Sequence, residues 1–136
     1  MIVTPLYAGL LALWYLVLSL RVVNGRGKGI SLGDGGDAEL LRRIRGHANF
    51  AEYVPLILIL MGLLELGHFS LWVVHALGLS LLIARLLHGY ALSFTTHFKF
   101  GRMAGAGLTF LVLLVAGLLC TYQGISAYLL LSVNVH

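Results

Sequence analysis

Four long apolar segments constrain this chain more than any other feature of its sequence. They cover roughly residues 3–23, 38–66, 69–96 and 103–131, and an α-helix needs about 20 residues to cross a bilayer. Of all residues, 60% are hydrophobic and 10% are charged, whereas soluble domains carry about 25% charged residues. A water-soluble fold would lack the polar surface to cover itself. The sequence therefore predicts an all-α integral membrane protein, a single four-helix transmembrane bundle over residues 1–136.

Local signals mark where these helices begin and turn. Thr4, which precedes a proline, is the expected N-cap of the first helix, and Asp37 is the expected N-cap of the second. The first segment lacks a charged leader and a small-residue cleavage site, so we expect it to be retained. A short turn at Gly67 should fold the second and third helices into a hairpin, and the small residues Gly101 and Gly105 should allow a close helix approach.

Basic residues gather at two of the three connections. The short turn at residues 65–68 carries no Lys or Arg. The positive-inside rule therefore places the other two connections in the cytoplasm and both termini on the far side, which in a bacterium is the periplasm. The residues concerned are Arg21, Arg26, Lys28, Arg42, Arg43 and Arg45 around the first connection, and His97, Lys99 and Arg102 around the third.

Composition excludes two further classes of protein. The net charge is +4, but the basic residues lie in short stretches between apolar runs and are not interleaved with aromatic residues, so no nucleic-acid partner is expected. Cys120 is the single cysteine and lies inside an apolar run. It is expected to pack as a small hydrophobic side chain, and no disulfide framework, cysteine cluster or metal site is predicted.

Ionisable side chains lie inside two of the predicted helices, where they are energetically expensive and usually face a bundle interior or a cavity. Arg45, Asn49 and Glu52 recur at i, i+4 and i+7, which places them on one helical face. The third helix carries its own set near its cytoplasmic end: Arg85, His88 and Tyr90.

A hairpin folded at Gly67 would bring these two sets to one depth. Asn49 and Arg85 are each 18 residues from Gly67, and Gly46 and His88 are each 21 residues from it. All of them should therefore share one layer near the cytoplasmic boundary of the bilayer.

Two interpretations of this layer are open. Arg45 and Arg85 can extend their charged ends to the interface, with Glu52 paired to one of them so that it is not buried as a bare charge. Alternatively, the layer is a polar pocket that opens to the cytoplasm and suits an anionic, hydrogen-bonding ligand. The number of polar groups at one level favours the pocket. A transporter is not favoured, because the polar layer lies on one side of the membrane and no helix is broken at mid-depth.

The segment from Arg45 to Pro55 reads Arg-Gly-His-Ala-Asn-Phe-Ala-Glu-Tyr-Val-Pro. It resembles the signature Arg-x-x-x-Asn-x-x-Glu-Tyr-x-Pro of the MAPEG family, the membrane-associated proteins in eicosanoid and glutathione metabolism. The Gly-Asp-Gly-Gly turn at residues 33–36 is similar to that of small bacterial members.

This resemblance implies a homotrimer of four-helix protomers, with glutathione bound between subunits near the cytoplasmic face. It implies that Arg102 activates the thiol, with His97 as the alternative. The residues implied to hold glutathione are Arg45, Asn49, Glu52 and Tyr53 of one subunit, Ser19, Arg26 and His47 of its neighbour, and Arg85, His88 and Tyr90 of the third helix, whose Ala-Arg-Leu-Leu-His stretch is similar to the family pattern.

The side-chain chemistry suits glutathione, which carries two carboxylates, an ammonium group and a thiol. Guanidinium groups bind carboxylates in a bidentate manner, and Glu52 can receive the ammonium. A permanent cation at Arg102 would favour the thiolate, which is the nucleophilic form. The predicted function is glutathione transfer or glutathione-dependent peroxide reduction on hydrophobic electrophiles or lipid hydroperoxides, with glutathione as co-substrate. The alternative is a non-catalytic trimeric membrane protein that binds a lipid or a protein partner.

Overall fold

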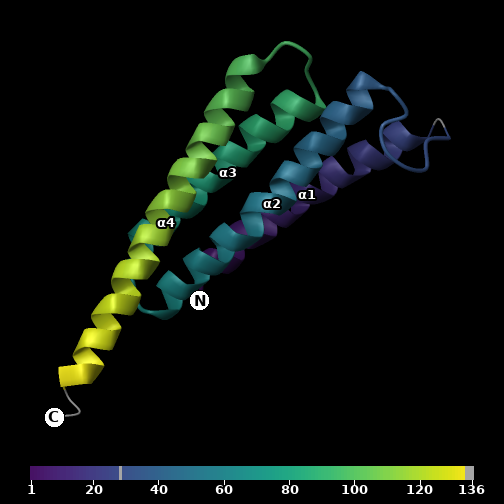
Figure 1. Ribbon diagram of the computed structural model, residues 1–136. Coiled ribbons are helices and arrows are strands. Elements are labelled where there is room, and N and C mark those ends of the chain that lie inside the picture. The colour runs from purple at the N-terminus through teal and green to yellow at the C-terminus, as the bar shows by residue number, and fades with distance from the viewer. Residues whose placement is uncertain (28, 134–136) are drawn as a thin grey trace.

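The computed structural model describes residues 1–27 and 29–133, so the predicted contribution of Lys28 lies outside the described residues. Within this part the secondary structure is helical, with no strand. Each of the four helices is long and apolar enough to cross a membrane, which confirms the all-α integral membrane fold. The helices are α1 (Val3–Arg26), α2 (Ala38–Leu66), α3 (Leu71–Ser93) and α4 (Lys99–Val133) (Figure 1).

Helices α2 and α3 form the centre of the bundle. Each of them contacts the other and both outer helices, whereas within the described residues α1 and α4 do not touch. The N-terminus and the α2–α3 turn lie at one end, and the α1–α2 and α3–α4 connections lie at the other (Figure 1). The two basic connections therefore share one end, as the sequence predicts.

Helix α4 is the longest and extends past the α2–α3 turn (Figure 1). The amide nitrogen Nε2 of Gln123 donates to the carbonyl of Leu63 at 3.4 Å, close to the C-terminal end of α2. The residues that follow Gln123 therefore lie beyond the packed part of the bundle.

The side chains of each helix divide into an inner and an outer face. In α1, Leu11 and Leu18 are fully buried, whereas Leu6, Leu13 and Leu20 are more than half exposed. Exposed leucines on a helix that is apolar all round are expected where lipid, and not water, surrounds the protein.

The start of α1 differs from the prediction. Thr4 was expected to be its N-cap, but the helix begins at Val3 and no side chain of its own caps it. Instead, the buried carboxylate of Glu65 accepts hydrogen bonds from the backbone N–H groups of Ile2, Val3 (2.9 Å) and Thr4 (2.8 Å). The prediction is wrong because the free donors of the first turn are satisfied from the end of α2.

The start of α2 agrees with the prediction. The carboxylate of Asp37 accepts from the backbone N–H groups of Glu39 at 2.8 Å and Leu40 at 3.2 Å, which is the expected N-cap geometry. This cap fixes where the helix that carries Arg45 begins.

Gly105 allows α4 to approach α3 closely. A Cβ atom at Gly105 would lie 2.6 Å from the carbonyl oxygen of Ala84 and 2.8 Å from the Cβ atom of His88. The close approach predicted for Gly101 and Gly105 is therefore found at Gly105. At Gly101 the nearest atoms belong to the ring of Phe98, the residue immediately before α4.

Candidate functional site

A polar groove lies between α2, α3 and α4, at the end of the bundle that bears the two basic connections. Its volume is about 410 Å³. Five of the predicted site residues meet here from three helices, which brings together parts of the chain more than 50 residues apart. The lining residues are Leu41, Arg42, Arg45, Asn49, Glu52, His88, Leu92 and Arg102.

The charged groups of the groove are not neutralised by one another. Arg45, Glu52 and Arg102 are exposed, and among the described residues neither Glu52 nor Arg45 forms an ion pair. The interpretation in which Glu52 pairs with an arginine of its own chain is therefore wrong. Three arginines and one glutamate line a common space, which suits a ligand that carries more negative than positive charge.

Arg85 lies beneath the groove and holds one of its walls in place. Its side chain is 1% exposed, with Nη2 donating to Oδ1 of Asn49 at 2.9 Å and Nη1 donating to Oγ1 of Thr109 at 3.3 Å. Because the amide oxygen of Asn49 accepts from Arg85, its Nδ2 donors remain for a ligand. Arg85 does not itself line the groove, so it acts on a ligand through Asn49 and through its buried charge.

Counting residues from Gly67 predicted that two pairs of residues lie side by side in the α2–α3 hairpin. The prediction is confirmed for one pair and wrong for the other. Asn49 and Arg85 are in contact, as predicted. Gly46 does not lie beside His88: a Cβ at Gly46 would lie 3.2 Å from atoms of Leu92 and Ser93, about one turn further along α3. Helix α3 begins only at Leu71, so the turn is centred after Gly67 and positions in α2 face residues later in α3 than the arithmetic gives. Arg85 still contacts Asn49 because its side chain is long.

His88 connects α3 to the start of α4. Its side chain is 5% exposed, and its Nδ1 lies 3.0 Å from the backbone carbonyl oxygen of Arg102. The same residue, Arg102, also lines the groove. His97, the alternative to Arg102, lies in the α3–α4 connection and does not line the groove.

The sequence interpretation missed two contributors to this site. Thr109 is 1% exposed, donates to the carbonyl of Gly105 at 2.7 Å and accepts from Arg85. Nothing in its apolar surroundings indicates this role. Arg42 lines the groove, and its position three residues before Arg45 was a usable signal, because residues at i and i+3 share a helical face.

Five other predicted residues lie outside the groove of their own chain. The Ser19 hydroxyl donates to the carbonyl of Tyr15 at 2.8 Å, and Arg26 Nη1 donates to the carbonyl of Ser31 at 3.1 Å. Tyr53, Tyr90 and His47 contact other rings: their ring centroids lie 5.4 Å from Phe110, 5.5 Å from Phe94 and 4.5 Å from Tyr15, respectively.

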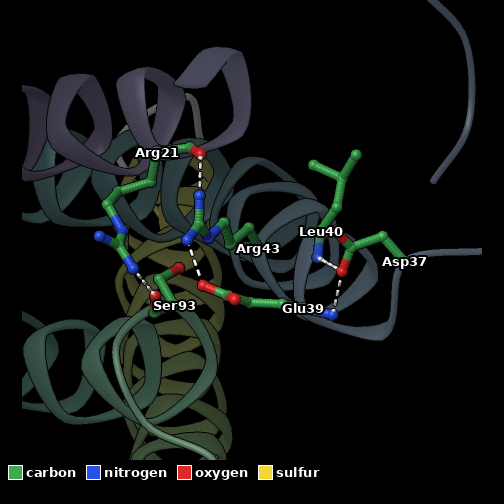
Figure 2. Close-up of polar contacts among 6 residues, drawn as sticks. All are labelled: Arg21, Asp37, Glu39, Leu40, Arg43 and Ser93. Atoms are coloured by element: carbon green, nitrogen blue, oxygen red, sulfur yellow. Dashed lines mark hydrogen bonds and ion pairs between the residues drawn. The ribbon is translucent and has the colours of Figure 1, made fainter. Parts of the chain in front are cut away.

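A second polar cluster braces the same end of the bundle (Figure 2). Arg43 forms an ion pair with Glu39 and donates to the carbonyl of Arg21 at 3.2 Å. Arg21 donates to the carbonyl of Ser93, and its guanidinium carbon lies 4.2 Å from the ring centroid of Phe94. These contacts join α1, α2 and α3, so the two arginines fix the helix ends that frame the groove.

The sequence model of the MAPEG family matches residues 4–122. The chain belongs to the MAPEG family. Two similar proteins are both named inner membrane protein YecN, one from Escherichia coli strain K12 and one from Escherichia coli O6:H1. Each is 42% identical over 89 residues, which is 65% of this chain and 68% of YecN. This match confirms the family resemblance that the sequence motif indicated. Three residues of that motif, Arg45, Asn49 and Glu52, line the groove.

Proposed function

We propose that this MAPEG protein binds glutathione in the polar groove and uses its thiolate to attack hydrophobic electrophiles or peroxides. The observation that carries the proposal is the groove itself, in which Arg45, Glu52 and Arg102 are exposed and form no ion pair with one another. Family membership supports it, because the family name refers to glutathione metabolism.

The groove offers partners for one carboxylate, the ammonium group and the thiol of glutathione. Arg45, with Arg42 beside it, can bind a carboxylate, and Glu52 can receive the ammonium group. Asn49 presents its amide donors because Arg85 occupies its oxygen. Arg102, from α4, is then the remaining cation of the groove and faces the thiol.

The chemistry that follows requires the thiolate, since a free thiol titrates near pH 8.5 and reacts only slowly at neutral pH. The Arg102 guanidinium stabilises the thiolate by its permanent charge. The sulfur then attacks an electrophilic carbon, forms a thioether and expels the leaving group. With a lipid hydroperoxide, the thiolate attacks the terminal oxygen, the O–O bond breaks, and the alkoxide leaves and takes up a proton to become an alcohol. The resulting sulfenic acid forms a disulfide with a second glutathione, releasing water.

A homotrimer would add four of the five predicted residues that lie outside the groove of their own chain. Ser19, Arg26, His47 and Tyr90 belong to faces other than the groove of their own chain, so they can reach glutathione only from an adjacent copy. The outer helices α1 and α4 carry exposed apolar side chains that an adjacent copy and lipid can cover. The groove between copies would admit a hydrophobic substrate from the bilayer.

We further propose that the protein resides in a bacterial inner membrane, with both termini in the periplasm and the groove near the cytoplasmic face. The name of the YecN relatives supports the membrane. The positive-inside rule supports the orientation, because the basic connections lie at the groove end.

Calorimetry with glutathione on the purified protein in detergent tests the proposal. Arg45→Ala should weaken binding about 10-fold or more, the value of a charge-assisted hydrogen bond of about 1.5–3 kcal/mol. Lys99→Ala is the matched control, because Lys99 is an exposed cation near the same end that does not line the groove, and it should bind as the wild type does.

Equal glutathione affinity of wild type and Arg45→Ala would refute the proposal that Arg45 binds a carboxylate of glutathione. The thiolate has its own ultraviolet absorbance, which should appear when glutathione is added. Binding without this absorbance and without product would instead support the non-catalytic alternative. Absence of both binding and thermal stabilisation would refute glutathione as the ligand.

A further inference from the structure

The imidazole of His88 is held in one orientation by α4. Gly105 lets the two helices approach until a Cβ at that position would contact the backbone nitrogen of His88 at 2.8 Å. One turn earlier in α4, the backbone carbonyl oxygen of Arg102 lies 3.0 Å from Nδ1 of His88. The ring is nearly buried, yet it borders the groove.

This contact assigns the tautomer of the neutral ring. A carbonyl oxygen can only accept a hydrogen bond, so Nδ1 must carry the proton. The other nitrogen, Nε2, then holds a free lone pair. The described residues give Nε2 no hydrogen-bond partner, and His88 lines the same groove as Arg102 and Glu52.

We propose that Nε2 of His88 accepts the proton of the bound thiol, an inference that rests on the proposed glutathione function. In this step the S–H bond breaks, sulfur keeps the electron pair, and a new N–H bond forms at Nε2. The guanidinium of Arg102 stabilises the thiolate, and its carbonyl holds the Nδ1–H of the resulting imidazolium. The imidazolium keeps this proton beside the thiolate and releases it to water in the groove once the sulfur has reacted, which restores the neutral ring.

The other ionisable groups around the ring do not suit this role. Arg42 and Arg45 face it from α2, Arg102 from α4, and Arg85 lies one turn away on α3. Guanidinium groups are permanently protonated and cannot accept a proton. Glu52 is the remaining acceptor, but it is the carboxylate available to the ammonium group of the ligand. His88 thus removes the proton from the thiol, and Arg102 stabilises the negative charge of the resulting thiolate.

The decisive variant is His88→Asn. An asparagine amide can replace Nδ1 as donor to the carbonyl of Arg102, but it offers no basic nitrogen to the groove. We expect glutathione affinity within about 3-fold of wild type. Turnover of a chloronitrobenzene electrophile at saturating glutathione should fall about 100-fold or more, within the usual contribution of a general base, together with the thiolate absorbance. In His88→Gly, added imidazole should restore part of the rate, which a purely structural role would not produce.

The possible outcomes separate the two proposals. Wild-type thiolate formation and turnover in His88→Asn would overturn the base and leave glutathione binding intact. Absence of glutathione binding by the wild type would instead refute the proposed function, and the base with it. Nitrogen NMR of the ligand-free protein provides a measurement that needs no variant to fold: a proton on Nε2 of neutral His88 would overturn the assignment.

Discussion

Replacing Asn49 with aspartate should change stability and ligand binding in opposite directions. Asn49 is the only side chain of the groove wall that hydrogen-bonds to Arg85 within the described residues, at 2.9 Å. Arg85 is 1% exposed, and no carboxylate of the described chain pairs with it. A carboxylate in the place of the amide would therefore meet a buried cation that has no counterion.

The magnitude follows from the distance. Two unit charges about 4 Å apart attract by roughly 4 kcal/mol at an effective dielectric constant of about 20. Desolvation of the new half-buried carboxylate removes part of this gain, so we expect Asn49→Asp to be more stable than wild type by about 1–2 kcal/mol. The same negative charge should also repel a carboxylate of the ligand, by about 2–3 kcal/mol for a separation of about 6 Å at the same dielectric constant. Glutathione affinity should therefore fall by roughly 30-fold or more.

Equilibrium unfolding in detergent and calorimetry with glutathione measure the two effects on the same sample. Asn49→Ala is the matched control, because it removes the acceptor without adding charge. It should lower stability by about 1.5–3 kcal/mol and also weaken binding. Destabilisation of Asn49→Asp to the same extent as Asn49→Ala would show that the uncompensated charge of Arg85 does not govern this site.

Three further perturbations test other parts of the structure. Glu65→Leu leaves the N–H groups at the start of α1 without an acceptor and should cost about 3 kcal/mol in unfolding measurements, whereas Glu65→Gln keeps one acceptor and should cost less; equal losses would contradict the capping role. Gly105→Val should destabilise the bundle by about 1–3 kcal/mol through overpacking against α3, while Gly107→Val, with no atom within 4 Å of its Cβ position, should lack this overpacking penalty. Arg102→Ala should retain glutathione binding but lose the thiolate absorbance at neutral pH, and an unchanged absorbance would exclude its role.

The part of the site carried by one helix was predictable because helical geometry is local. Arg45, Asn49 and Glu52 are spaced to share a face whatever surrounds them, and the structure places all three in one groove. The contact between Asn49 and Arg85 was also accessible, since a tight hairpin relates depth to sequence distance from the turn. The same rule wrongly paired Gly46 with His88, because the centre of the turn depends on how the two helices pack and is not fixed by the residues of the turn alone.

Two features could not have been predicted from local sequence. Thr4 carries a good capping side chain, yet the donors at the start of α1 are satisfied by Glu65 from another helix. Thr109 has no charged neighbour in sequence and becomes a partner of Arg85 because α4 packs against α3 at Gly105. In both cases a hydrogen bond between helices determines which polar groups are satisfied.

The amino-acid order is sufficient to establish the membrane environment, the four helices, the family and the polar face of α2. These follow from hydropathy, periodicity and motif spacing, which depend on residues within a few turns of one another. The tautomer of His88, the burial of Arg85 and the absence of an internal ion pair for Glu52 in the described chain required the packed bundle. They depend on where α4 meets α3 and α2, and such contacts arise from the shape of whole helix surfaces.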